Sequence, residues 1–265
     1  MTVGPRVARW VRMLLDACIP RTCAGCSTTL AVGHGAAVCS ACTTAMLPPP
    51  APLCPRCGLP LVGATASCPD CIRHPPAFAT ARAATVYRRE DARLNPLARA
   101  IHALKYGGRR DVAATFGALL AARWPFDRDV LLVPVPSHPA RLRARGHDHA
   151  LRLARALARC SGLALATGVL VRRRPTPAQA RLAAGRRRQN LADAFVVGRP
   201  ALVRGQRIVL VDDVLTTGAT ADACARALLA AGARRVDVCV VARTPFAPAQ
   251  AAHEGAALEG GRGGR

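Results

Sequence analysis

Eight of the 12 cysteines lie in the first third of the chain as four Cys-x-x-Cys pairs, and no other feature constrains the fold as strongly. The intervals between successive pairs are 12, 11 and 10 residues. One pair places two thiolates along one edge of a tetrahedron, and a second pair at this spacing completes the four-thiolate set that structural zinc prefers. The spacing therefore predicts two zinc ribbons. Their expected ligands are Cys23, Cys26, Cys39, Cys42, Cys54, Cys57, Cys68 and Cys71.

The spacing does not determine which two pairs share each zinc site. Sequential pairing builds one site from the first four cysteines and another from the last four, and interleaved pairing is also compatible. A disulfide framework would need an oxidising compartment, and a thioredoxin-type redox role would need a single pair after a strand. His34 and His74 lie near the pairs and are expected to be bystanders, since eight thiols suffice for two ions. The cysteines predicted to be core residues are Cys18, Cys160, Cys224 and Cys239.

Composition divides the chain into three parts. Residues 1–76 are expected to hold a short amphipathic helix and the double zinc ribbon. Residues 80–245 alternate apolar runs with helical stretches, which is typical of an α/β domain with a parallel sheet. Residues 246–265 are low-complexity, and we expect them to be disordered. Because charged residues interrupt the apolar N-terminal segment, we expect a cytoplasmic protein without stable membrane insertion.

Three apolar runs predict the strands of this sheet. They cover residues 129–136, 207–213 and 235–243. A helical pattern at 148–162 lies between the first two runs, and another at 219–232 lies between the last two. Strand, turn, helix and strand in succession form a βαβ unit, and ligands of such sheets bind beyond the carboxyl ends of the strands. The second run ends with two aspartates, and these are therefore placed at the expected ligand-binding edge.

Asp212 and Asp213 suit a sugar diol. Two adjacent carboxylates can accept charge-assisted hydrogen bonds from the two hydroxyls of a ribose. The turn that follows offers backbone N–H groups, hydroxyls and a helix N-terminus to one phosphate, so the segment suits a ribose 5-phosphate. The P-loop and the dinucleotide-binding glycine motif are both absent from the sequence. The predicted phosphate-binding residues are Thr216, Thr217, Gly218, Ala219 and Thr220.

Several sequence motifs together resemble those of a known protein family. The segment "VLVDDVLTTGAT" is similar to the phosphoribosyl pyrophosphate (PRPP) binding motif of type I phosphoribosyltransferases. The four cysteine pairs, "LKYGGRRD", "VPVPSHPARLRARG" and "TPAQARLAAGRRRQNLADAF" follow the order found in the ComF family (ComF/GntX-like). This resemblance implies a Rossmann-like parallel sheet of the type I phosphoribosyltransferase kind with a small N-terminal zinc-ribbon module.

The resemblance also implies ligands and roles. Asp212 and Asp213 would hold the ribose hydroxyls of PRPP bound with magnesium, and Arg141 and Arg145 would face its pyrophosphate. A loop over the site would contribute Gln179, Arg187 and Asn190. The implied reaction displaces pyrophosphate from the anomeric carbon. The implied cellular role is natural transformation, in which the protein would assist incoming single-stranded DNA alongside a helicase. A non-catalytic accessory protein that uses PRPP only as a regulatory ligand is the alternative.

The basic residues carry less information than their number suggests. The formal net charge is +23, and 13 arginines lie between Arg141 and Arg188, where the only acid is Asp148. This charge predicts anionic partners, although a coding bias toward arginine would raise it too. Lys105 is the only lysine and a candidate catalytic residue, because an ammonium can shift its pKa where a guanidinium cannot. For Asp148 we favour a helix N-cap over a magnesium ligand.

Overall fold

A five-stranded parallel sheet forms the centre of the protein. The computed structural model describes residues 20–63, 65–87, 95–173 and 194–244. The strand order is β1-β7-β6-β2-β3, and every pairing in this sheet is parallel. Its strands are β1 (Thr80–Val86), β2 (Val130–Pro134), β3 (Ala164–Leu165), β6 (Arg207–Leu215) and β7 (Arg235–Arg243). A separate antiparallel pair is formed by β4 (Leu170–Arg172) and β5 (Phe195–Val197).

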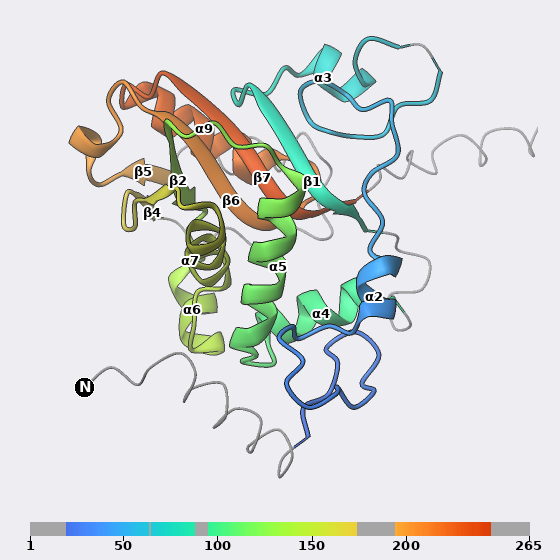
Figure 1. The fold of residues 1–265 in the computed structure, drawn as a ribbon. Coiled ribbons are helices and arrows are strands. Elements are labelled where there is room, and N and C mark those ends of the chain that lie inside the picture. Colours follow the sequence, from blue (N-terminus) through green and yellow to red (C-terminus); the bar gives the residue numbers. More distant parts are fainter. Residues whose placement is uncertain (1–19, 64, 88–94, 174–193, 245–265) are drawn as a thin grey trace, which may run out of the picture.

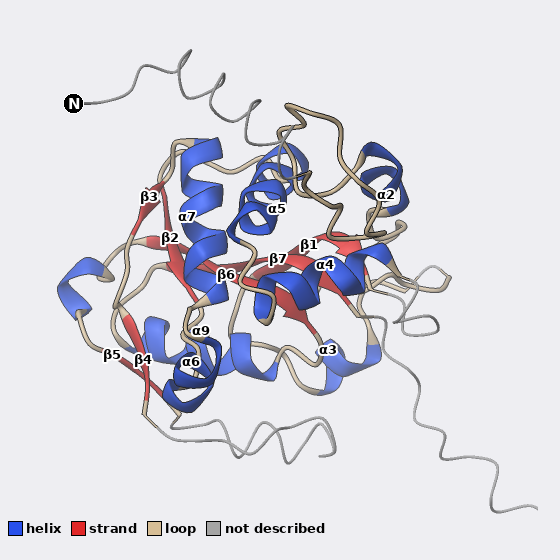
Figure 2. Ribbon diagram, turned by 90° about the horizontal axis from the view of Figure 1, so that it is seen from below, coloured by secondary structure: helices blue, strands red, loops and turns tan. Residues whose placement is uncertain are grey.

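The central strands are apolar throughout because both faces of the sheet are covered. In β7 every residue after Arg235 is buried. One face carries α4 (Pro96–Lys105), α5 (Arg110–Arg123) and α7 (His149–Ser161), whose apolar side chains share one core with Leu132 and Val209. The other face carries α9 (Ala219–Ala230) and the β4–β5 pair. Figure 2 shows α5 and α7 on one side of the sheet and α9 on the other.

The two cysteine-rich segments lie on opposite faces of this sheet. The first includes α2 (Ser40–Ala45), which lies beside α4, and it shares the core of α4 and α5 (Figure 1). The second includes α3 (Pro69–Arg73) and shares the core of α9 through Phe78. The shorter elements that remain are α6 (Pro139–Arg145) and the 3-10 helix η2 (Pro200–Leu202).

The predicted elements agree with the structure, with small shifts of their ends. The run 207–213 continues as a strand to Leu215, and the helix predicted from residue 148 begins at His149 with Asp148 as its cap. Cys224 and Cys239 are buried as predicted, but the prediction for Cys160 is wrong because it is exposed in the last turn of α7. The predicted N-terminal helix, Cys18 and the tail lie outside the described residues. No described helix is long and apolar enough to cross a bilayer.

Candidate functional site

The acid pair lies where β6 extends past its neighbour β2. Pro134, the last residue of β2, pairs with Val211, so Asp212 and Asp213 follow at the edge predicted for ligands. The backbone N–H of Asp213 donates to Oδ1 of Asp212 at 2.8 Å, and that of Val214 donates to Oδ1 of Asp213 at 2.9 Å. Asp213 is buried, and the side chain of Asp212 is 23% exposed. One carboxylate is therefore accessible and the other is enclosed by the protein.

A lysine and a histidine from different helices reach this pair. Lys105, the last residue of α4, forms an ion pair through Nζ with Oδ2 of Asp213. His149, the first residue of α7, places Nε2 3.7 Å from Oδ1 of Asp213 and 3.9 Å from Oδ1 of Asp212. Three elements distant in sequence thus meet at one point. The ligand atoms of His149, Asp212 and Asp213 all lie within 4.8 Å of one another, close enough to share a cation.

These contacts separate the pKa values of the two aspartates. Burial favours the neutral form of Asp213, but the charge of Lys105 and the hydrogen bond from His149 outweigh it and lower the pKa. Burial, followed by the negative charge of Asp213, raises the pKa of Asp212 to about 7. For His149, burial disfavours the charged form, but the two carboxylates overcome this and raise its pKa. Asp213 is therefore ionised at neutral pH, while Asp212 titrates there.

Arg145 joins the site through His149. Its Nη1 lies 3.4 Å from Nδ1 of His149, and its Nη2 donates to the hydroxyl of Tyr106 at 2.8 Å. The guanidinium also lies 4.5 Å from the centre of the Tyr106 ring, a cation–π contact. An arginine can only donate hydrogen bonds, so Nδ1 of His149 must be the acceptor in this contact. When His149 is neutral, its proton is therefore on Nε2, the atom that faces the carboxylates. His147 is buried and contacts the carbonyl of Leu104 at 2.9 Å, which ties α4 to the segment before α7.

The predicted phosphate-binding turn connects β6 to α9. The strand ends at Leu215, and Gly218 caps the helix with φ 79° and ψ −4°, a left-handed conformation that favours glycine. Oγ1 of Thr217 accepts from the N–H of Ala219 at 3.4 Å. Thr216 and Thr217 thus lie in the turn, while Ala219 and Thr220 form the first turn of α9. The arrangement presents a helix N-terminus that begins four residues after the end of the acid-bearing strand.

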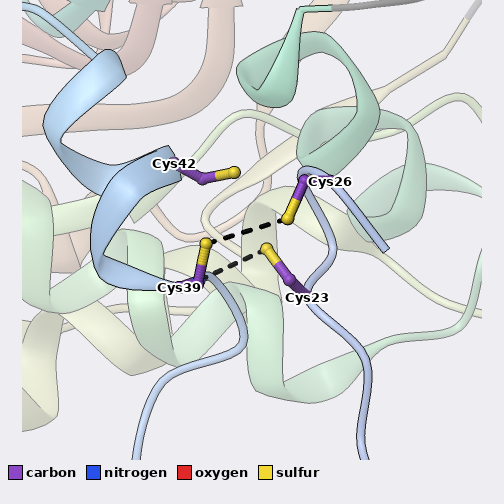
Figure 3. A group of neighbouring side chains, drawn as sticks. All are labelled: Cys23, Cys26, Cys39 and Cys42. Atoms are coloured by element: carbon purple, nitrogen blue, oxygen red, sulfur yellow. Dashed lines mark hydrogen bonds between the residues drawn. The ribbon is translucent and has the colours of Figure 1, made fainter. Parts of the chain in front are cut away.

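The cysteines form two clusters by sequential pairing, which excludes the interleaved alternative. In each cluster the four sulfurs lie within 4.8 Å of one another. Figure 3 shows the first cluster converging from two loops and the start of α2, with the sulfurs of Cys26 and Cys39 3.8 Å apart. In the second, the sulfurs of Cys57 and Cys68 are 3.6 Å apart. A zinc ion with bonds of about 2.3 Å places its sulfurs about 3.8 Å apart, so both clusters suit structural zinc. The members are Cys23, Cys26, Cys39 and Cys42, then Cys54, Cys57, Cys68 and Cys71.

The structure gathers most of the predicted site residues. Asp212, Asp213 and Lys105 are in contact, and Arg145 is linked to them. Arg141 lies in α6, but its side chain is not among those described. Gln179, Arg187 and Asn190 lie outside the described residues. Asp148 is the N-cap of α7, accepting from the N–H of Leu151 at 3.1 Å, so the preference for a cap is confirmed.

Sequence reasoning did not assign a role to His149. The available signal was its place at the start of a helix that follows a buried strand. Such a helix start lies at the same sheet edge as the carboxyl end of that strand.

Comparison with protein-family models identifies the two domains of the chain. Residues 14–72 match the double zinc ribbon domain, and residues 150–254 match the phosphoribosyl transferase domain. The chain is therefore a phosphoribosyltransferase-fold protein with a double zinc ribbon.

Full-length relatives then define the family. The DNA utilization protein YhgH of Salmonella typhimurium is 33% identical over 233 residues, covering 85% of this chain and 98% of that protein. The protein of the same name in Escherichia coli is 32% identical with the same coverage. Competence protein F of Haemophilus influenzae is 28% identical over 203 residues, covering 72% of this chain and 85% of that protein. The chain belongs to the family of these DNA utilization and competence proteins, the ComF family.

Proposed function

We propose that this protein binds PRPP with magnesium and acts as a phosphoribosyltransferase that supports the use of incoming DNA. The observation that carries the proposal is the acid pair at the end of β6, held by Lys105 and His149 and followed directly by the turn that begins α9. In this proposal Asp212 and Asp213 accept hydrogen bonds from the ribose hydroxyls. The backbone N–H groups and hydroxyls of residues 216–220 bind the 5-phosphate.

The remaining side chains suit the leaving group. Loss of pyrophosphate from the anomeric carbon builds negative charge on the departing oxygens, and a guanidinium can stabilise that charge. Arg145, oriented by Tyr106 and His149, is the described arginine that would contact it. Lys105 keeps Asp213 ionised, so that this carboxylate remains an acceptor at neutral pH.

The donor set also fits a magnesium ion that arrives with PRPP. Magnesium retains several waters and is held in proteins by one or two carboxylates together with substrate phosphates. Asp212 is the more accessible carboxylate, since Lys105 already pairs with Asp213. Bound there, the ion would neutralise charge on the leaving pyrophosphate, while this chain would hold the ribose and exclude water.

The link to DNA comes from the relatives. Their names assign them to DNA utilization and competence. The net charge of +23 would favour contact with single-stranded DNA, and the helicase partner implied by the family resemblance belongs to the same proposal. A protein that binds PRPP only as a regulatory ligand would use the same site, so turnover of an acceptor base separates the two roles.

Isothermal titration with PRPP and magnesium tests the ligand. We expect the wild type to bind and the double variant Asp212→Asn/Asp213→Asn to bind at least about 10-fold more weakly, because charge-assisted hydrogen bonds contribute about 1.5–3 kcal/mol each. Asp127→Asn/Asp129→Asn is the matched control, since it removes the same charge from two exposed residues that pair with Arg207. Absence of binding by the wild type, or equal affinity of both double variants, would overturn the proposal.

A further inference from the structure

Arg243 connects the second zinc cluster to the phosphate-binding turn. It is the last residue of β7 and is only 3% exposed. Its Nε donates to the carbonyl of Cys57 at 3.2 Å, and its Nη2 lies 3.9 Å from the sulfur of the same cysteine. Its Nη1 donates to the carbonyl of Leu215 at 2.9 Å and to that of Thr216. One guanidinium therefore holds a predicted zinc ligand and the start of the turn together.

The charge of Arg243 is explained by the cluster. Within the described ranges no carboxylate forms an ion pair with Arg243, although an unpaired buried charge is costly. A zinc ion bound by four thiolates carries a net negative charge, and the Arg243 guanidinium is in contact with one of those thiolates. The metal-loaded cluster thus supplies the counter-charge for Arg243.

A second contact joins the same two regions. Asp222, in the first turn of α9, accepts from the N–H of Ala77 at 2.6 Å, just after the second ribbon. Between the ribbon and the turn lies a cavity of about 280 Å³, lined in part by Cys57, Gly218, Asp222 and Arg243. The hydrogen bonds of Arg243 and Asp222 therefore add directed links between the ribbon and the turn to the apolar packing around Phe78.

We propose that the second zinc ribbon positions the phosphate-binding turn, with Arg243 as the positioning residue. Zinc fixes the Cys57 backbone, Arg243 passes this placement to the carbonyls of Leu215 and Thr216, and the following N–H groups receive the ribose phosphate. The first ribbon lies on the opposite face of the sheet and has no such connection among the described residues. The inference rests on the proposed function and extends it to the control of ligand affinity.

Thermodynamic linkage supplies a test that needs no turnover. If zinc in the second ribbon strengthens PRPP binding, then bound PRPP must strengthen zinc retention there by the same factor. We expect saturating PRPP with magnesium to slow the release of about half of the protein's zinc to a chelator that does not bind magnesium, by at least about 5-fold, and to leave the other half unchanged. Pyrophosphate with magnesium, which lacks the ribose 5-phosphate, should give no protection.

Matched variants separate positioning from general stability. Arg243→Lys keeps the charge but lacks the planar fork, and we expect it to lose the protection and to bind PRPP at least about 10-fold more weakly. Arg235→Lys, at the other end of β7, is the control and should behave as the wild type. Cys54→Ser/Cys57→Ser should lose one zinc ion and weaken PRPP binding, whereas Cys23→Ser/Cys26→Ser should lose one ion and bind normally.

The outcomes are distinguishable. PRPP binding without any change in zinc release, or with equal protection of both ions, would overturn this inference and leave the proposed function intact. Failure of the wild type to bind PRPP would overturn the proposed function first. If a cysteine variant fails to fold, the release measurement on the wild type still decides between these results.

Discussion

At the scale of single residues, Lys105 determines the charge state of the acid pair. Its ammonium contacts Asp213 and stabilises that carboxylate in the ionised form, and the resulting negative charge then contributes to the raised pKa of Asp212. Adjacent residues with the same side chain are thereby given different roles, one a permanent acceptor and one that titrates near neutral pH. Environments that push two pKa values apart are a common property of functional sites.

The raised pKa of Asp212 predicts a stability cost that depends on pH. In the unfolded chain this carboxyl ionises at about pH 4, but in the folded protein only near pH 7, so its contribution destabilises the fold progressively across that interval and fully above it. Asp212→Asn should therefore raise the Tm at pH 8 by more than at pH 5, with about 2–4 °C for each kcal/mol gained. Thermal unfolding at both pH values measures this. Asp129→Asn, at an exposed position, is the control, and an unchanged Tm of Asp212→Asn at pH 8 would contradict the assignment.

At the scale of elements, α7 begins at the site because Asp148 caps it. The Asp148 side chain accepts from the N–H of Leu151, and the helix ends at Gly162 in the left-handed conformation, φ 73°. Because His149 is the first residue of α7, fixing the start of the helix also fixes the position of His149 beside the acid pair. The cap is thus part of how the sequence places His149, a candidate site residue, beside the acid pair.

Replacing the cap should affect stability and leave magnesium dependence unchanged. Asp148→Ala should destabilise the protein by about 1 kcal/mol, a typical cost of losing an N-cap, whereas Asp148→Asn should retain the cap. Chemical denaturation measures the stability, and titration with PRPP over a range of magnesium concentrations measures the cation requirement. A higher magnesium requirement in both variants would indicate that Asp148 is a cation ligand after all.

The elements differ in how far the sequence predicts them. β6 and β7 were predictable because strands covered on both faces are continuously apolar. β1, with the sequence TARAATV, is partly exposed at the sheet edge and gives no such run. Cys160 was predicted as core from its Ala- and Leu-rich surroundings, but the buried positions of α7 end at Leu157. His149 lies beside the acid pair because α7 approaches β6, and the local signal for this was limited to its place at the start of a helix.

At the scale of the whole molecule, the net charge is the basis for expecting contact with single-stranded DNA. The net charge is +23, and aromatic residues make up only 3% of the chain, so base stacking by this protein alone would be limited. We expect binding to single-stranded DNA that depends little on sequence and weakens at least about 10-fold between 50 and 200 mM salt, in line with counterion release. Fluorescence anisotropy with labelled oligonucleotides of two unrelated sequences measures both properties. A flat salt response would contradict phosphate tracking.

The placement of the two ribbons on opposite faces of one sheet has a consequence for synthesis. The second ribbon leaves the ribosome early, but the surfaces that cover it, α9 and β7, are made last among the described elements. Until Arg243 has been translated, the Cys57 thiolate lacks its guanidinium and the apolar side of the ribbon lacks its cover. A chain that stops before β7 would therefore leave the apolar side of the second ribbon uncovered, and exposed apolar surface of this kind favours aggregation.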